Sequence, residues 1–519
     1  MPEGIEVPPG AILHSPFSPL TPISPLYPDG LIDAQWTLKH QELIPSVVLC
    51  FYNLVSDPNQ STLSDNQIKS DVNKLRNLII QSGYKIKLAI VLLSDPVGDH
   101  TDYLQDRIEI IRRGCALDPK SVFLMPPNET HEDLARMAEN MLITLYGASM
   151  EYYKELGRHS RKKRGRGVAP PPTVPPTTGT SQTLSLAGWN VRYDFKSAIL
   201  AEYRLEMENA LRSYEQAYEN LLSSEVVELI PSWSPRWNEA RLLADVIAIR
   251  SIRCLLWNAQ NSAAVRRWQF HRERMADLVE RLGRGTSNYG WEAWEARWAI
   301  VMANLMEKAG IPELDPAEMR LYLNPEKNIM GERLQPWELL HHTGYWYRLA
   351  SRHLYARRAR ARAMPEDDRR PPGSSPASHI ASRGFTYDTF MCPEPHEEFP
   401  LEHMSYRGVD HNSMIIDCLS RALDEFLQRD QVRLAAELSL ELARELSLRQ
   451  EWAKVVNLLR PIWQNMSFRK ERWPSLAEEV SWALRAAAAK TGELGDVVTI
   501  DWELLDRGKV ARIPSDFAC

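Results

Sequence analysis

The sequence predicts a mainly α-helical protein, a tetratricopeptide-like α-solenoid of stacked helical hairpins preceded by a small α/β domain. Apolar residues recur every three or four positions through most of the chain after residue 130, which places them on one face of a helix. Short, continuous apolar runs alternate with helical patterns between residues 46 and 126. Paired helical segments also alternate small and aromatic residues in the order typical of a tetratricopeptide unit.

Composition narrows the class of protein. The chain has 519 residues, 44% of them hydrophobic, and a net charge of −6. This length is enough for roughly two to four domains, and the apolar content is enough to give them hydrophobic cores. The overall charge neither attracts nor strongly repels nucleic acid, so any basic function would have to be local. We expect no nucleic-acid partner. The six cysteines form no C-x-x-C pair, and neither a signal peptide nor a long apolar run is present, so we expect a cytoplasmic protein.

The first two regions differ sharply in amino-acid composition and pattern. Residues 1–45 are expected to form a Pro-rich N-terminal arm, because the Ser-Pro and Thr-Pro units of the first 30 residues exclude helix. Residues 46–157 are expected to form the small α/β domain, which runs into a long helix from residue 131. The expected elements before that helix are strands at 46–54, 86–93 and 121–126, with helices at about 62–82 and 99–114. Their alternation predicts a parallel sheet.

The loops of this sheet carry little chemistry. VSDPNQST follows the first strand and SDPVGDHT follows the second, and neither contains G-x-x-x-x-G-K or G-x-G-x-x-G. Such loops hold phosphates at the ends of parallel strands. We therefore expect a scaffold domain, with a nucleotide-binding enzyme acting through this domain as an alternative.

Residues 158–187 are expected to be a basic and Pro/Thr-rich disordered linker. Its basic cluster consists of Arg161, Lys162, Lys163, Arg164 and Arg166. Such a cluster can contact an anionic membrane or an acidic partner, and a solvated loop is the alternative. No aromatic residue lies among the cations, which argues against nucleic acid.

The remaining chain is expected to form the solenoid in two parts, residues 188–363 and 411–510, separated by an irregular insertion at 364–410. The first hairpin is expected at 189–222, followed by helices at 236–258, 262–282, 291–310 and 336–361. The residues expected to pack within hairpins are Phe195, Ala198, Ala210, Leu211, Tyr214, Ala217, Tyr218, Leu442, Ala443, Trp452 and Leu459.

Catalytic and metal-binding motifs were sought along the whole sequence. H-E-x-x-H, G-x-S-x-G, a Cys/His metal box and an EF-hand loop do not occur, so we expect no enzyme, no cofactor and no metal. His341 and His342 are adjacent and would point about 100° apart on a helix, so they cannot share an ion as an i, i+4 pair does.

Four stretches occur in a set order: the long helix at 131–156, VRYDFKSAILAEYRLEMENALRSYEQAYENL, HHTGYWYRLASRH, and ELARELSLRQEWAKVVNLLRPIWQ with WALRAAA. As an ordered set they resemble the Foie gras family, found in a large subunit of the TRAPP (transport protein particle) complex, in a fungal form. Members of this family continue into β-rich domains, so the resemblance implies the N-terminal part of a longer protein.

The resemblance also implies a function. It implies a non-catalytic scaffold subunit of the TRAPP vesicle-tethering and Rab guanine-nucleotide exchange complex, in endoplasmic reticulum to Golgi transport and autophagy. The implied partners are other TRAPP subunits, a Rab GTPase indirectly, and anionic membrane at the periphery of Golgi and endoplasmic reticulum to Golgi membranes. A general tetratricopeptide-type interaction adaptor is the alternative.

Overall fold

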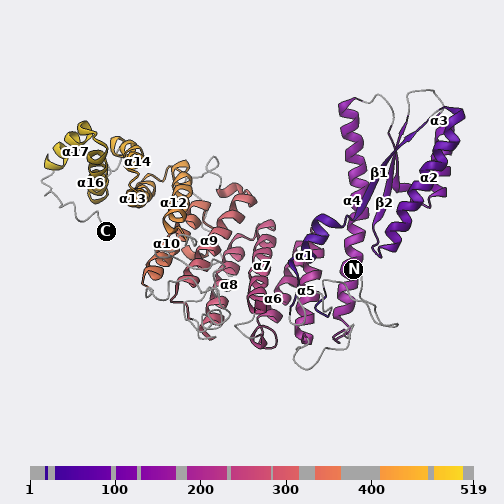
Figure 1. The fold of residues 1–519 in the computed structure, drawn as a ribbon, viewed down its shortest axis with the longest axis horizontal. Helices are drawn as coiled ribbons and strands as arrows, with labels where there is room; N and C mark the ends of the chain where they lie inside the picture. The colour runs from indigo at the N-terminus through magenta and orange to yellow at the C-terminus, as the bar shows by residue number, and fades with distance from the viewer. Residues whose placement is uncertain are drawn as a thin grey trace, which may run out of the picture. The chain divides into compact units, whose positions relative to one another are not determined.

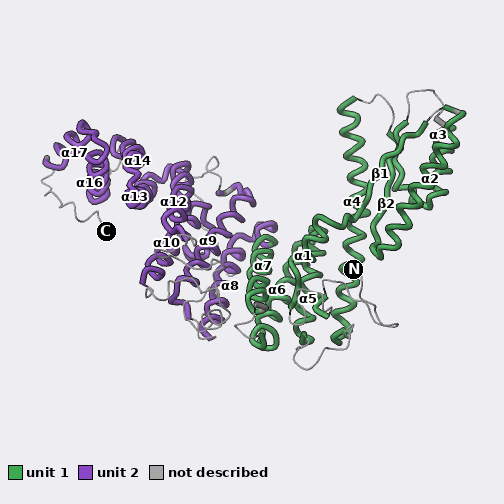
Figure 2. The backbone as a smooth tube through the Cα atoms, in the orientation of Figure 1, with its two compact units in different colours: residues 1–254 green, residues 255–519 purple. Residues whose placement is uncertain are grey.

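The computed structural model describes residues 18–20, 30–55, 57–94, 101–125, 130–170, 184–230, 235–281, 285–314, 334–363, 409–465 and 473–506. The chain divides into two compact units, residues 1–254 and 255–519, shown in different colours in Figure 2.

Unit 1 contains a parallel sheet whose strand order follows the sequence. Strands β1 (Val47–Leu54), β2 (Lys87–Ser94) and β3 (Val122–Met125) pair in the order β1-β2-β3. Helix α2 (Pro58–Gln81) connects the first pair and α3 (Thr101–Gly114) the second. Right-handed crossovers in a sequential sheet place both helices on the same face, as Figure 1 shows. The predicted α/β domain is confirmed.

The core of this domain lies between the sheet and helices α2 and α3. Alternate residues of a strand face the same side, so every second residue of β1 and β2 contributes. The buried members are Leu54, Ile68, Val72, Leu88, Ile90, Leu92, Ile111, Cys115 and Leu117. The middle strand β2 is covered on both faces, which explains its unbroken apolar run.

Helix α4 (His131–Arg164) joins the sheet to the helical part of unit 1. Thr130 caps it, accepting a hydrogen bond from the backbone N–H of Asp133. Near the sheet, Ser149 Oγ lies 2.8 Å from Ser46 Oγ. Further along, Ser160 Oγ donates to the backbone carbonyl of Tyr193 on the next helix, at 3.0 Å. α4 is therefore held at both ends by different elements.

The predicted linker at 158–187 is wrong at both ends, because helix extends into it. α4 continues through the basic run to Arg164, and α5 (Leu186–Glu202) begins at Leu186. Packing explains the longer α4: Gly157 and Ser160 are buried against α5, and cations suit the C-terminal end of a helix. Residues 171–183 lie outside the described part of the chain.

The N-terminal arm contains a short helix that the proline content did not predict. α1 (Ala34–Leu38) is capped by Asp33 and continues into η1 (Lys39–Leu43). Upstream, Leu20 is buried against Trp189. A few described residues of the arm, Leu20, Leu31 and Trp36, are thus buried within unit 1, and residues 1–17 and 21–29 lie outside the description.

The first predicted hairpin is formed by α5 and α6 (Met207–Leu221). Leu205 adopts a left-handed backbone conformation, with φ 58°, in the turn between them. Glu202 is buried near this turn and accepts hydrogen bonds from Tyr214 at 2.5 Å and from Arg250 at 2.9 Å. Arg250 belongs to α7 (Pro235–Trp257), so the buried carboxylate joins the hairpin to the next helix.

Unit 2 is itself an array of helices. Its helices are α8 (Asn261–Arg281), α9 (Tyr289–Ala309), α10 (Thr343–Arg362), α12 (His411–Gln428), α13 (Val432–Leu448), α14 (Trp452–Gln464), α16 (Pro474–Thr491) and α17 (Leu494–Asp506). From α9 to α17, each of these helices packs against the next. The predicted mainly α-helical, stacked-hairpin fold is confirmed.

One boundary in this array differs from the sequence prediction. The helix expected at 336–361 is split, because a 3-10 turn at Pro336–Glu338 precedes α10, which begins at Thr343. A proline restricts the residue before it and starts a new turn, which the apolar periodicity does not report. The predicted insertion at 364–410 lies outside the described residues apart from 409 and 410.

Candidate functional site

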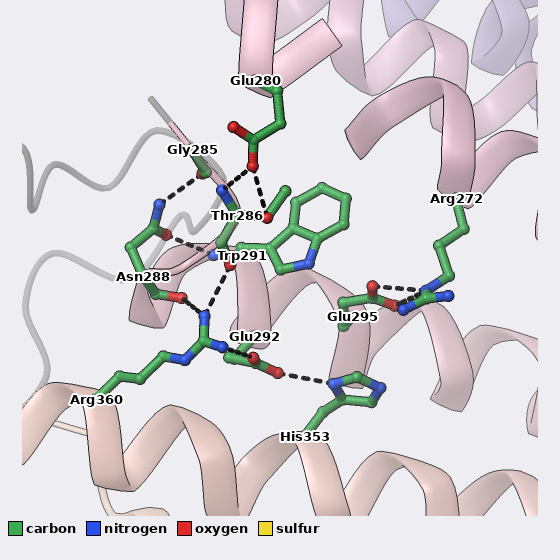
Figure 3. Close-up of polar contacts among 10 residues, drawn as sticks. All are labelled: Arg272, Glu280, Gly285, Thr286, Asn288, Trp291, Glu292, Glu295, His353 and Arg360. Atoms are coloured by element: carbon green, nitrogen blue, oxygen red, sulfur yellow. Dashed lines mark hydrogen bonds and ion pairs between the residues drawn. The ribbon is translucent and has the colours of Figure 1, made fainter. Parts of the chain in front are cut away.

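The buried helix α9 carries two carboxylates in an otherwise apolar environment. Glu292 and Glu295 are 6% and 1% exposed. Glu295 accepts hydrogen bonds from Arg272 Nε of α8 at 2.6 and 2.8 Å. Glu292 lies 2.7 Å from His353 Nδ1 and 2.9 Å from Arg360 Nη2, both on α10 (Figure 3). The two carboxylates thus join α9 to the helices on either side of it.

The loop before α9 belongs to the same polar network. Arg360 Nη1 donates to the backbone carbonyl of Thr286 at 2.7 Å, and Thr286 donates to Glu280 Oε1 through its N–H and its hydroxyl. Asn288 caps α9, accepting from Trp291 N at 2.8 Å. Figure 3 shows these groups around the start of α9. Since every drawn carboxylate has a cationic or hydrogen-bonding partner, we interpret the network as structural.

The stretch HHTGYWYRLASRH also makes contacts between helices. His342 is the N-cap residue of α10, and its ring contacts Phe426 of α12 with centroids 4.7 Å apart. Two residues later, a Cβ on Gly344 would lie 2.8 Å from Glu425 Cβ. Trp346 packs against Trp268 of α8, at 5.1 Å between centroids. This stretch therefore connects α10 to α12 and to α8.

Most of the predicted hairpin residues are inside the array. The buried ones are Phe195, Ala198, Ala210, Tyr214, Ala217, Tyr218, Leu442, Ala443 and Leu459. Leu211 and Trp452 are half-buried. The binding surface of the protein must therefore be sought among other residues.

The predicted basic cluster is divided by the structure. Arg161 and Lys162 are exposed on the last turn of α4, and Arg164 pairs with Asp194 of α5 through Nε at 3.1 Å. Lys163 and Arg166 are exposed as well, but they also line a cavity of about 420 Å³ in unit 1, which we call the basic pocket. The cluster is thus not one uniform surface.

The basic pocket is completed by residues that the sequence prediction missed. Arg192 and Lys196 lie one turn apart on α5 and contribute two further cations. The other described lining residues are Ser18, Trp36, His40, Leu156, His159, Ser160, Val168, Ala169, Pro170, Trp189, Tyr193 and Leu200. No described lining residue is acidic. The sequence signal that could have identified Arg192 and Lys196 is their spacing of four residues on a helix that is otherwise largely apolar and buried.

The groups in the pocket lie in a positive field. The pKa of Lys196 is well below its usual value because it is buried and because Arg192, Lys163 and Lys39 are close. Burial, with Lys39 and Lys196 nearby, lowers the pKa of His40 to about 4. Arg192 has its pKa lowered to about 10 by burial, an effect that Tyr193 and Asp33 oppose. The charged form is thus less favourable at several neighbouring positions than it would be in water.

The end of the sheet where a nucleotide would bind holds an ion pair. Arg107 of α3 binds Asp65 of α2 through Nε at 3.1 Å and Nη2 at 2.8 Å, and also donates to the carbonyl of Val55 just after β1. This arginine is therefore engaged within the domain. The loop at 95–100 lies outside the described residues, so the described part leaves the nucleotide-binding alternative untested.

Within the described residues, no three His, Cys, Asp or Glu side chains are grouped closely enough to hold a metal ion. None of the described helices combines the length and apolar character needed to span a membrane. His341 and His342 have separate contacts, since His341 Nε2 lies 3.0 Å from the carbonyl oxygen of Pro336.

Helix α17 carries an unusual apolar stripe. Leu494, Val498, Trp502 and Leu505 are between 66% and 78% exposed, at successive spacings of four, four and three residues. The opposite side of the helix is buried through Ile500 and Leu504. α17 is therefore apolar on two faces, one of which is open to solvent.

Two family models match the sequence. One, described as Foie gras liver health family 1, matches residues 236–507, which is more than half of the chain. The other, described as Trafficking protein particle complex subunit 11 N-terminal domain, matches residues 1–134. The first match begins after the α5–α6 hairpin, which we predicted to open the Foie gras array.

The chain is also similar to curated proteins. Trafficking protein particle complex subunit 11 of Homo sapiens is 21% identical over 497 residues, and the protein of the same name from Gallus gallus is 21% identical over 498 residues. Each alignment covers 93% of this chain and 40% of the relative, so the chain spans about 40% of the length of these relatives.

Among solved structures, the chain is similar to a circular tandem repeat protein with novel repeat topology and enhanced subunit contact surfaces. The identity is 14%, the TM-score is 0.22, and the match covers 87% of this chain and 82% of that chain. A TM-score this low carries no argument about the fold. The family match over residues 236–507 shows that the chain belongs to the Foie gras family.

Proposed function

We propose that this chain belongs to a subunit of the TRAPP complex and forms the N-terminal region of that subunit. The observation that carries the proposal is that relatives named as subunit 11 of a trafficking protein particle complex align with 93% of the chain. Stacked hairpins provide an extended surface, which suits a scaffold. The finer proposal is a non-catalytic role in endoplasmic reticulum to Golgi transport and autophagy, with other TRAPP subunits as partners and a Rab GTPase contacted indirectly.

The apolar stripe of α17 is the surface that we propose for contact with another protein. Apolar side chains that remain exposed together mark interaction sites more often than scattered ones do. Trp502 is the largest of them, and tryptophan is enriched among residues that dominate binding energy. The basic residues Arg161 and Lys162 are proposed to contact anionic membrane at the Golgi periphery.

Affinity purification of the tagged endogenous protein, followed by mass spectrometry, tests the proposal. We expect other TRAPP subunits to co-purify, and Trp502→Glu to reduce their recovery without changing the amount of the folded chain. Trp257→Glu is the matched control, because Trp257 is also exposed but lies on α7. Recovery of partners that include no TRAPP subunit would instead support a general interaction adaptor.

A further inference from the structure

We propose that the basic pocket binds a small ligand with several clustered phosphate groups, of the inositol phosphate class, either free or as a lipid headgroup. The pocket lies entirely within unit 1, so this binding does not depend on membership of the TRAPP complex. Its four cationic side chains, Lys163, Arg166, Arg192 and Lys196, come from the end of α4, the segment after it, and α5.

The arrangement of charge points to an anion. Like charges brought together at low dielectric repel, and burial makes the repulsion stronger. Lys163 and Lys196 both have their pKa values lowered, with burial as the first cause and neighbouring cations as the second. A bound anion would offset this cost and stabilise the charged form of both lysines. The pocket is thus organised as the complement of a negative ligand.

The number of cations argues for more than one phosphate. A single carboxylate neutralises one cation, whereas clustered phosphates supply several charges and many acceptor oxygens. Lysine and arginine present three and five N–H donors, respectively. A cavity of about 420 Å³ is within the size range of small-molecule sites and is too small to enclose a polymer.

The aromatic walls argue against a nucleotide. Lys196 Nζ lies 4.7 Å from the centroid of the Trp36 ring, and the His40 ring lies 4.8 Å from the same ring. Trp189 is likewise contacted by Arg192, at 5.9 Å, and by Tyr193. Since cations and rings of the protein already contact both tryptophans, a base has little free ring surface on which to stack. A non-aromatic polyol phosphate fits better.

Isothermal titration of the 519-residue chain with inositol hexakisphosphate tests the proposal. The pocket variant is Lys163→Gln/Lys196→Gln. The matched control is Lys154→Gln/Arg158→Gln, which also removes two positive charges from α4, both at exposed positions outside the pocket. We expect the pocket variant to bind at least about tenfold more weakly, which corresponds to about 1.4 kcal/mol, and the control to bind nearly as well as the original chain.

Vesicle flotation distinguishes the two sources of the ligand. Phosphatidylcholine vesicles contain either phosphatidylinositol bisphosphate or enough phosphatidylserine to give the same total charge. Pocket-dependent flotation with the phosphoinositide alone assigns a lipid headgroup, and binding of inositol hexakisphosphate alone assigns a free ligand. Three results would overturn the proposal. They are an equal loss of binding in the pocket variant and the control variant, equal flotation of the original chain with phosphatidylserine and with the phosphoinositide, and no binding to any probe.

A thermal unfolding scan keeps the test valid if a variant is unstable. Without ligand, we expect Lys196→Gln to melt at a higher temperature than the original chain, because it removes a buried cation from a positive field. With inositol hexakisphosphate, the original chain should gain stability and Lys196→Gln should gain less. A ligand-induced shift of the same size in both proteins would contradict a role for Lys196.

Discussion

Trp268 and Trp298 each donate the indole N–H to the backbone carbonyl of the other, at 3.0 and 3.2 Å. Their rings are nearly parallel, 9° apart, with centroids separated by 6.2 Å. The pair joins α8 to α9 and lies beside Trp346 of α10. Two large apolar side chains thereby satisfy their polar atoms without water, which allows tryptophan at the centre of a helical array.

Replacing Trp298 by phenylalanine should destabilise unit 2 by about 1–3 kcal/mol, because it removes a donor and leaves the buried carbonyl of Trp268 without that hydrogen bond. Urea denaturation of the original and variant chains measures the change. Trp257→Phe is the control, since Trp257 is 64% exposed, and should cost much less. Equal effects of the two substitutions would show that the reciprocal bonds contribute nothing specific.

Gly344→Ala should be destabilising by about 1–3 kcal/mol, because overpacking forces neighbouring backbone apart. The added Cβ would lie 2.8 Å from Glu425 Cβ and 3.1 Å from the ring of His342. Gly147 in α4 is the matched control, because its added Cβ would meet nothing within 4 Å. Gly147→Ala should stabilise by about 0.5–1 kcal/mol through helix propensity, so the two glycines should give thermal shifts of opposite sign.

Removing Arg272 should cost more than removing both members of its ion pair with Glu295. Arg272→Gln leaves a carboxylate that is 1% exposed without its cation, which we expect to cost about 2–4 kcal/mol because Arg272 itself is partly exposed. The double variant Arg272→Gln/Glu295→Gln should recover much of that loss. A double-mutant cycle by chemical denaturation gives the coupling energy, and additive effects would contradict the predicted coupling.

The free energy of unfolding should fall as the pH is lowered from 6.5 to 4, in part through His342. Burial, with Arg429 and His341 nearby, lowers the pKa of His342 to about 4. In this window the unfolded chain binds a proton that the folded chain does not, so acid favours unfolding, by about 2 kcal/mol for this group.

Denaturation at a series of pH values measures this effect. His342→Asn should reduce the pH slope, and it places a good N-cap residue at the start of α10. Because the substitution also removes the contact with Phe426, it changes stability at every pH. The quantity to compare is therefore the change in the free energy of unfolding with pH. A slope unchanged by the substitution would contradict the assignment to His342.

Periodicity was enough to predict most elements of the fold. The three strands and the α5–α6 hairpin fall within a few residues of the predicted ranges, since each depends on a local apolar pattern. The secondary structure of charged and Pro-rich segments was harder to predict. The end of α4 pairs with α5 through Arg164 and Asp194, and Trp36 of α1 contacts Lys196 of α5. Such tertiary contacts override local propensity.

The basic pocket was only half predictable. The run around Lys163 is obvious in the sequence, but its partners Arg192 and Lys196 are about thirty residues away and lie in a stretch of otherwise apolar helix. Glu292 and Glu295 on α9 follow the same pattern, and they turned out to be buried ion-pair partners. Charged residues within an all-round apolar helix deserve separate inspection, because burial makes each of them costly unless it is paired or bound.

Helix α4 has a mechanical consequence for unit 1. With 34 residues it is about 50 Å long, and it contacts the sheet through Ser149 and Glu155 and α5 through Ser160 and Arg164. Because Ser160 and Arg164 lie on either side of Lys163 and bond to Tyr193 and Asp194, the α4 and α5 walls of the basic pocket are tied to each other. The same helix that contacts the sheet therefore also fixes the spacing of the pocket's cations.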